Sequence, residues 1–185
     1  MTWGVFLDRD GVLTEAPVID GKAMAPTHRS ELRIVAGARA ALDRLREAGA
    51  VLIVVTNQPD ITRGGLRQDE LDAMHERLAS ELPLDGIEVC PHSGAELCEC
   101  RKPRPGMLIR AAAAHGIDRA SSWMVGDRWV DVLAGREAGA RTVLVDRPYS
   151  WSATSAGSPP DDLAADHHVA DVGEAADVIL ANRTG

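Results

Sequence analysis

Short, continuous apolar runs alternate along the chain with longer segments in which apolar residues recur every three or four positions. The apolar runs occupy residues 5–7, 51–55, 86–89, 123–125 and 142–145. Runs of this length, ended by a turn signal or a polar cluster, are typical of buried strands. The segments with helical spacing are residues 37–48, 71–82, 105–116, 132–138 and 172–180. The alternation predicts an α/β fold, a three-layer Rossmann-like parallel sheet with helices on both faces.

Residues 14–35 separate the first predicted strand from the first predicted helix and have no clean periodicity. We expect a long loop here, and loops of this length in a compact domain are usually functional. Thr27, His28 and Arg29 are therefore candidates for contact with a substrate. The default interpretation is nevertheless that they are ordinary solvated loop residues.

A second irregular segment, residues 148–166, is rich in Ser, Pro, Gly, Ala and Asp. Such a composition predicts a surface loop or a mobile segment, in which we expect Tyr149 and Trp151 to pack against the rest of the molecule. His167 and His168 follow it without a metal-ligand partner at suitable spacing. We interpret both histidines as surface or edge residues.

Length and charge narrow the class of protein. A chain of 185 residues can bury a substantial core, and we expect residues 1–185 to form a single domain. The net charge of −8 argues against nucleic acid or an anionic membrane as the main partner. The sequence shows neither a signal-peptide pattern nor an apolar run of membrane-spanning length. We therefore expect the protein in the cytoplasm. We also expect a monomer, although none of these features reports the oligomeric state.

Two carboxylates, Asp8 and Asp10, directly follow the first apolar run. Ligands bind at this end of the strands in an open α/β sheet, and two adjacent acids repel each other unless a cation lies between them. The pair also suits covalent phosphoryl transfer, in which one carboxylate attacks phosphorus and the other moves the proton. The structural alternative is a capped strand followed by an Asp-Gly turn.

Other polar side chains follow other predicted strands. Because parallel strands present their carboxyl ends to one edge of a sheet, we expect these side chains to converge there despite their distance in sequence. The converging residues are Asp8, Asp10, Thr56, the Arg101-Lys102 pair and Asp127. Turn chemistry alone does not account for polar groups at four strand ends.

All three cysteines fall in one short stretch, unlike a secreted disulfide framework. Cys90 and His92 form one close pair, and Cys98 and Cys100 form the other. Thiolates and imidazole in a closed set of four favour tetrahedral zinc. With every position filled, the zinc is expected to be structural, pinning a loop so that the basic residues after it are aimed at a phosphate. The alternative is buried free thiols beside an unrelated histidine.

These motifs resemble those of haloacid-dehalogenase (HAD) superfamily phosphatases. The matching residues are Asp-Arg-Asp-Gly at 8–11, Thr-Asn-Gln at 56–58, Arg-Lys-Pro at 101–103, and Gly126-Asp127 with Asp131. Cys-Pro-His and Cys-x-Cys-Arg-Lys-Pro-x-Pro-Gly-Met are similar, more narrowly, to the D-glycero-D-manno-heptose-1,7-bisphosphate 7-phosphatases, whose sister group is the histidinol-phosphate phosphatases. The resemblance covers most of the chain and implies a HAD-like fold with a zinc-pinned loop and without a large cap domain.

The resemblance also implies roles. Asp8 would be the nucleophile that forms an aspartyl-phosphate, and Asp10 the general acid and base. Mg²⁺ would bind to Asp8, Asp127 and the backbone carbonyl of Asp10. Thr56 and Lys102 would hold the transferring phosphoryl group.

The same resemblance assigns substrate binding to Asn57, Gln58, Arg101 and Arg128. The loops near residues 16–19 and 59–64 depart from the usual family sequence, and both lie where a substrate would be selected.

The sequence thus predicts a magnesium-dependent phosphatase that acts on a small phosphorylated metabolite, with heptose 1,7-bisphosphate as the first candidate and histidinol phosphate as the second. Polynucleotide 3′-phosphatases have similar motifs, but the acidic charge and the lack of a basic stripe disfavour them. A catalytically silent, zinc-stabilised binding module is the alternative of another class. It would be expected to have lost the acidic residues, which are present here.

Overall fold

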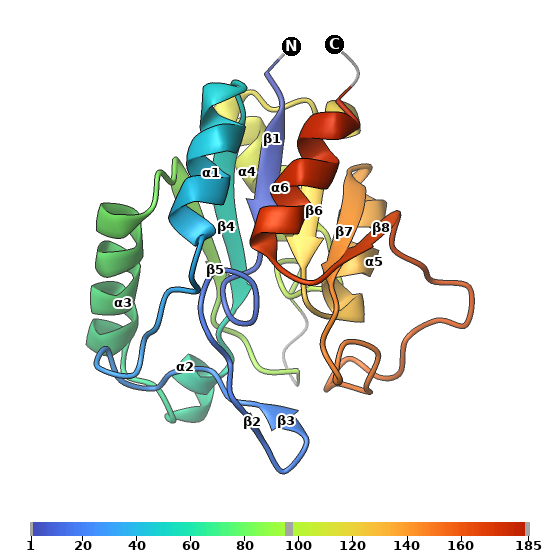
Figure 1. Ribbon diagram of the computed structural model, residues 1–185. Helices are drawn as coiled ribbons and strands as arrows, with labels where there is room; N and C mark the ends of the chain where they lie inside the picture. The colour runs from blue at the N-terminus through green and yellow to red at the C-terminus, as the bar shows by residue number, and fades with distance from the viewer. Residues whose placement is uncertain (1, 95–97, 184–185) are drawn as a thin grey trace.

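The computed structural model describes residues 2–94 and 98–183. Its centre is a six-stranded parallel sheet in the order β5-β4-β1-β6-β7-β8 (Figure 1). The strands are β1 (Gly4–Leu7), β4 (Val51–Asn57), β5 (Gly86–Cys90), β6 (Trp123–Gly126), β7 (Arg141–Val145) and β8 (His167–Val169). The predicted parallel α/β sheet is confirmed.

Helices cover both faces of the sheet. They are α1 (Ala38–Glu47), α2 (Asp60–Arg63), α3 (Gln68–Glu81), α4 (Gly106–His115), α5 (Trp129–Ala138) and α6 (Val172–Ala181), with a 3₁₀ turn, η1 (Arg119–Ser121). The apolar stripes of α1, α3 and α6 share one core with the sheet, and those of α4 and α5 share another. In Figure 1, α1 and α6 cross in front of the sheet, with α4 and α5 behind it.

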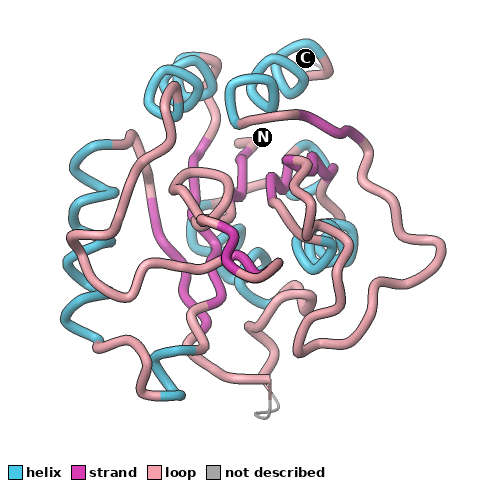
Figure 2. The backbone as a smooth tube through the Cα atoms, turned by 60° about the horizontal axis from the view of Figure 1, so that its bottom comes forward, coloured by secondary structure: helices cyan, strands magenta, loops and turns pink. Residues whose placement is uncertain are grey.

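The order of the strands decides where a site can form. From β1 the chain passes to β4 and β5 on one side and then returns to β6 on the other. Such a reversal leaves a crevice at the carboxyl ends of the strands. Loops gather over this edge of the sheet in Figure 2, whereas both termini lie at the opposite end in Figure 1.

The shortest elements were absent from the sequence prediction. Within the segment expected to be a loop, β2 (Val18–Ile19) and β3 (Lys22–Ala23) form an antiparallel hairpin. Its turn is Asp20-Gly21, with both residues at positive φ, so the Asp-Gly hairpin signal was present in the sequence. The one-turn α2 and the edge strand β8 are too short to give a periodic pattern.

The described residues add this small hairpin at the carboxyl edge rather than a separate cap domain. None of the helices in residues 2–94 and 98–183 is long and apolar enough to cross a bilayer.

Candidate active site

A pocket of about 340 Å³ opens at the carboxyl ends of β1, β4 and β6. Asp8 follows β1, Thr56 lies near the end of β4, and Asp127 follows β6. Lys102 reaches the same pocket from the loop between β5 and α4. The structure therefore brings together four side chains that are far apart in sequence, as the parallel topology predicts.

Lys102 occupies the centre of a buried charge cluster. Its Nζ lies 2.8 Å from Asp8 Oδ1 and 2.6 Å from Asp131 Oδ1, and it donates a hydrogen bond of 2.8 Å to the Val55 carbonyl. Asp131 is in the first turn of α5, where it also accepts a 3.0 Å hydrogen bond from the Arg128 amide. Because Lys102 is only 2% exposed, water does not solvate its ammonium, and these partners must compensate its charge.

The cluster contains three carboxyl groups but only the one ammonium of Lys102. Ligand atoms of Asp8, Asp127 and Asp131 all lie within 4.8 Å of one another. Burial raises the pKa of Asp8 to about 6, although Lys102 opposes this shift. Burial, with the charges of Asp8 and Asp131, also raises the pKa of Asp127 well above its ordinary value. Both shifts are relieved if a cation binds between the carboxylates.

The chemistry of this cluster fits Mg²⁺. Carboxylate oxygens are the ligands that this ion prefers, and Asp127 Oδ1 is buried without a hydrogen-bond donor among the described residues. Two glycines allow the close packing. A Cβ at Gly11, where φ is +89°, would lie 2.1 Å from Asp127 Oδ2, and one at Gly126 would lie 2.1 Å from the Cβ of Asp131.

Asp10 is held by a separate set of donors. The buried guanidinium of Arg9 donates to both carboxylate oxygens of Asp10 at 2.9–3.1 Å. Thr14 Oγ1 and Gln58 Nε2 each donate to it at 3.0 Å. Behind them, His75 Nε2 lies 3.2 Å from Arg9 Nη1. Burial and the charge of Arg9 lower the pKa of His75 to about 4, so a neutral imidazole accepts this contact and the carboxylate is fixed in orientation.

The four residues predicted to bind substrate, Asn57, Gln58, Arg101 and Arg128, all line the pocket. Asn57 also forms two 3.1 Å hydrogen bonds with the backbone of Lys102, one as donor and one as acceptor. Asn57 thus fixes the loop that carries the lysine.

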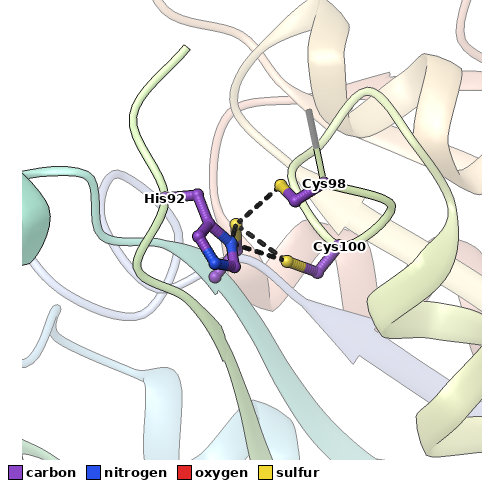
Figure 3. Close-up of side chains that lie close together, drawn as sticks. His92, Cys98 and Cys100 are labelled. Atoms are coloured by element: carbon purple, nitrogen blue, oxygen red, sulfur yellow. Dashed lines mark hydrogen bonds between the residues drawn. The ribbon is translucent and has the colours of Figure 1, made fainter. Parts of the chain in front are cut away.

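The Cys/His side chains gather beside the pocket. Cys90 Sγ lies 3.1 Å from Cys100 Sγ and 3.8 Å from Cys98 Sγ, and His92 Nδ1 lies 3.2 Å from Cys100 Sγ. Figure 3 shows His92, Cys98 and Cys100 pointing toward one another. A tetrahedron with metal–sulfur bonds of about 2.3 Å has edges of about 3.8 Å, so the cluster has the size of a closed tetrahedral site. Arg101 donates to the His92 carbonyl at 3.0 Å, which joins this loop to the pocket.

Thr27, His28 and Arg29 are exposed and do not line the pocket, which agrees with their interpretation as solvated loop residues. Arg29 forms hydrogen bonds of 2.7–3.3 Å with Glu70 on α3, and Glu31 accepts from the amides of Thr27 and His28. These ion pairs and turn contacts hold the three residues on the helix side. The pocket is lined instead by other residues of the same loop, Ala16, Ala23, Met24 and Ala25.

Sequence reasoning gave no role to three residues at the site. Asp131 was visible as the second acid of Gly-Asp-x-x-x-Asp, and its position directly before a predicted helix could have marked it as a partner of Asp127. Arg9 gave a weaker signal, as a charge next to an apolar run. Tyr149 was expected only to pack the segment that contains it. Its hydroxyl instead donates a 2.7 Å hydrogen bond to Asp127 Oδ2.

Comparisons with known proteins agree with this geometry. Residues 99–175 match a family model described as HAD-hydrolase-like. The D-glycero-beta-D-manno-heptose-1,7-bisphosphate 7-phosphatase of Pasteurella multocida is 38% identical over 157 residues, which cover 78% of this chain and 82% of that protein. The Pseudomonas putida protein of the same name is 37% identical, covering 87% and 95%.

A solved structure extends the similarity. The D,D-heptose 1,7-bisphosphate phosphatase of B. bronchiseptica, crystallised with magnesium and phosphate, superimposes with a TM-score of 0.79 at 29% identity and covers 97% of this chain and 98% of that one. The chain belongs to the D-glycero-beta-D-manno-heptose-1,7-bisphosphate 7-phosphatase family of HAD-like hydrolases.

Proposed function

We propose that this protein is a magnesium-dependent phosphatase that removes the 7-phosphate of D-glycero-D-manno-heptose 1,7-bisphosphate. The observation that carries the proposal is the position of Asp8, which lies in the pocket beside the Lys102 ammonium and within the cluster of Asp127 and Asp131. A nucleophile next to an ammonium and a cation site meets the main requirement of phosphoryl transfer, which is positioning with charge neutralisation.

Asp8 attacks phosphorus and forms an aspartyl-phosphate as the bond from phosphorus to the sugar oxygen breaks. Asp10 gives its proton to that departing oxygen. It then takes a proton from the water that attacks the aspartyl-phosphate, which releases inorganic phosphate and restores Asp8. Lys102 and Thr56 hold oxygens of the transferring group. The hydrogen bonds from Arg9 and Gln58 keep Asp10 aimed while its protonation changes.

We infer that Mg²⁺ binds to Asp8, Asp127 and the backbone carbonyl of Asp10, with Asp131 as a further carboxylate of the same cluster. When bound, the ion neutralises the charge that the phosphoryl group brings against these acids. The unpartnered Oδ1 of Asp127 supports this assignment.

Stability without magnesium should depend on pH. The pKa of Asp8 is raised from 3.8 to about 6 in the folded protein, so its contribution to stability is fully present below pH 3.8 and is lost as the pH rises through 6. In magnesium-free buffer the Tm should therefore fall between pH 5 and pH 7. Mg²⁺ competes with protons for the same oxygens, and we expect it to raise the Tm more at pH 7 than at pH 5. An equal gain at both values would contradict the assignment of the carboxylates.

Guanidinium groups support a substrate with a second phosphate. Arg63, Arg101 and Arg128 all line the pocket, and guanidinium is well suited to bind phosphate oxygens. We propose that they contact the part of the sugar phosphate that does not react, as Asn57 and Gln58 do nearer to Asp8.

The function is tested by measuring phosphate release with Mg²⁺ and a panel of substrates. Heptose 1,7-bisphosphate should be cleaved with the highest kcat/KM, above the corresponding monophosphates and histidinol phosphate. A 3′-phosphorylated oligonucleotide should not be cleaved. Preference for histidinol phosphate would transfer the assignment to the sister group, and failure to cleave any member would support a silent binding module.

We further propose that Cys90, His92, Cys98 and Cys100 hold a structural Zn²⁺. The size of the cluster and the bond from Arg101 to the His92 carbonyl support this, because a metal there would fix the loop that ends in the active-site lysine. We also expect residues 1–185 to form one HAD-like domain that acts in the cytoplasm as a monomer.

Loss of zinc should reduce the thermal stability of the protein. His92→Ala should lower the Tm by on the order of 10 °C, because zinc binding contributes directly to the folding free energy. The matched control is His168→Ala, since His168 is half exposed and pairs with Asp146 at 2.9 Å. Tm values and zinc content by elemental analysis test the prediction. A zinc-free variant with the wild-type Tm would contradict the structural role.

A further inference from the structure

The segment after β7, residues 147–157, is part of the active-site wall. Trp129, the first residue of α5, donates from its amide to the Ser150 carbonyl at 2.9 Å and from its indole Nε1 to the Ser152 carbonyl at 3.0 Å. Further along, Ser155 Oγ accepts a 3.1 Å hydrogen bond from Arg101. The segment is thus fixed at one end to α5 and at the other to the loop that carries Lys102.

Within this segment, two adjacent residues donate hydrogen bonds to Asp127, one to its side chain and one to its backbone. Tyr149 donates its hydroxyl to Asp127 Oδ2 at 2.7 Å, and Ser150 donates its hydroxyl to the Asp127 backbone carbonyl at 2.6 Å. Tyr149 is only 4% exposed. Asp127 Oδ1, by contrast, is buried with no hydrogen-bond donor in residues 2–94 and 98–183.

We propose that Tyr149 is a positioning residue for the cation site: by occupying Oδ2 of Asp127 it fixes the carboxylate and leaves Oδ1 to bind the divalent ion. The inference rests on the proposed function, because it requires that Asp127 bind magnesium. Hydrogen bonds to a metal-binding carboxylate orient it and affect the affinity of the site.

The chemistry of the phenol suits this role. It is a neutral donor, so it orients Asp127 without cancelling the negative charge that attracts the cation, whereas the Lys102 ammonium neutralises charge at Asp8 and Asp131. The position of the hydroxyl is also constrained. A Cβ at Gly11 would lie 2.9 Å from it, and the Arg128 guanidinium lies over the ring, 4.6 Å from its centre.

Tyr149→Phe removes the hydroxyl and keeps the ring. Isothermal titration of the full-length protein with MgCl₂ should show a Kd for Mg²⁺ raised by about 10–100-fold. In phosphate-release assays the concentration of Mg²⁺ for half-maximal rate should rise similarly, with kcat at saturating Mg²⁺ close to that of the wild type. The Tm without magnesium should change little. The matched control is Trp151→Phe, an aromatic change in the same segment at a side chain that stacks on His168, which should leave the Kd unchanged.

A wild-type Kd in Tyr149→Phe would overturn the inference, as would a variant whose only change is a lower Tm. Ser150→Ala is a second variant. It removes the hydrogen bond to the Asp127 carbonyl and should also raise the Kd for Mg²⁺. The proposed function fails separately. If the wild-type protein binds no Mg²⁺, or if Asp127→Asn binds it as tightly as the wild type does, the assignment of Asp127 to the cation site is wrong. The proposed role of Tyr149 is then wrong as well.

Discussion

Asp8→Asn should lower the kcat for phosphate release by at least about 10⁴-fold, which is the scale expected when a covalent nucleophile is removed. The carboxamide has almost the same shape, so the pocket keeps its form. Its oxygen is a poor nucleophile and cannot form the aspartyl-phosphate. Steady-state phosphate release at saturating Mg²⁺ and substrate measures the effect.

The matched control is Asp43→Asn, the same chemical change at an exposed acid on α1 that pairs with Arg39 at 2.9 Å. Its kcat should equal that of the wild type. Rapid acid quenching during turnover should also trap one phosphoryl group on the peptide that contains Asp8, and the Asp8→Asn variant should lack it. Turnover near the wild-type rate in that variant, or a label on another peptide, would disprove the covalent role.

The parts of the fold that the sequence predicts are those in which one physical pattern dominates. The continuous aliphatic run over residues 51–55 corresponds to β4, which lies between two other strands and under helices on both faces. A strand in that environment needs apolar residues on both sides. The convergence of Asp8, Thr56 and Asp127 follows from the same topology, because consecutive parallel strands all end at one edge.

The contacts that sequence reasoning missed depend on loop conformation, which has no periodic signal. Tyr149 reaches Asp127 because Trp129 and Arg101 fix the segment around it, and no local pattern encodes that path. His28 and Arg29 were candidates for substrate contact only because they lie in a long loop, and the loop's length does not say which of its residues face the pocket. In the structure both residues pair with Glu70 on α3.

Lys102→Met should both destabilise and inactivate the protein, because it replaces a buried charge with an apolar chain of similar length. The change leaves Asp8 and Asp131 close together without their shared cation. Loss of one partner from a buried ion pair typically costs about 3–5 kcal/mol, and we expect a decrease of this size in the free energy of unfolding at pH 7 without magnesium. Loss of a cationic donor to the transferring phosphoryl group should also reduce kcat by about 10²–10³-fold.

The pH dependence separates loss of charge from loss of packing. The two carboxylates outweigh the effect of burial on Lys102 and raise its pKa above the usual value, so the ammonium stays charged at both pH 5 and pH 7. At pH 5 Asp8, whose pKa is already raised to about 6, can take up a proton in the variant and become neutral. Urea unfolding should therefore show a smaller loss in the free energy of unfolding at pH 5 than at pH 7.

The control Arg110→Met removes an exposed partner of Glu88 and should cost at most about 1 kcal/mol at either pH. An equal penalty at pH 5 and pH 7 for Lys102→Met would mean that Lys102 stabilises the fold by filling space. It would contradict the view that the Lys102 ammonium stabilises the fold by balancing the charges of Asp8 and Asp131.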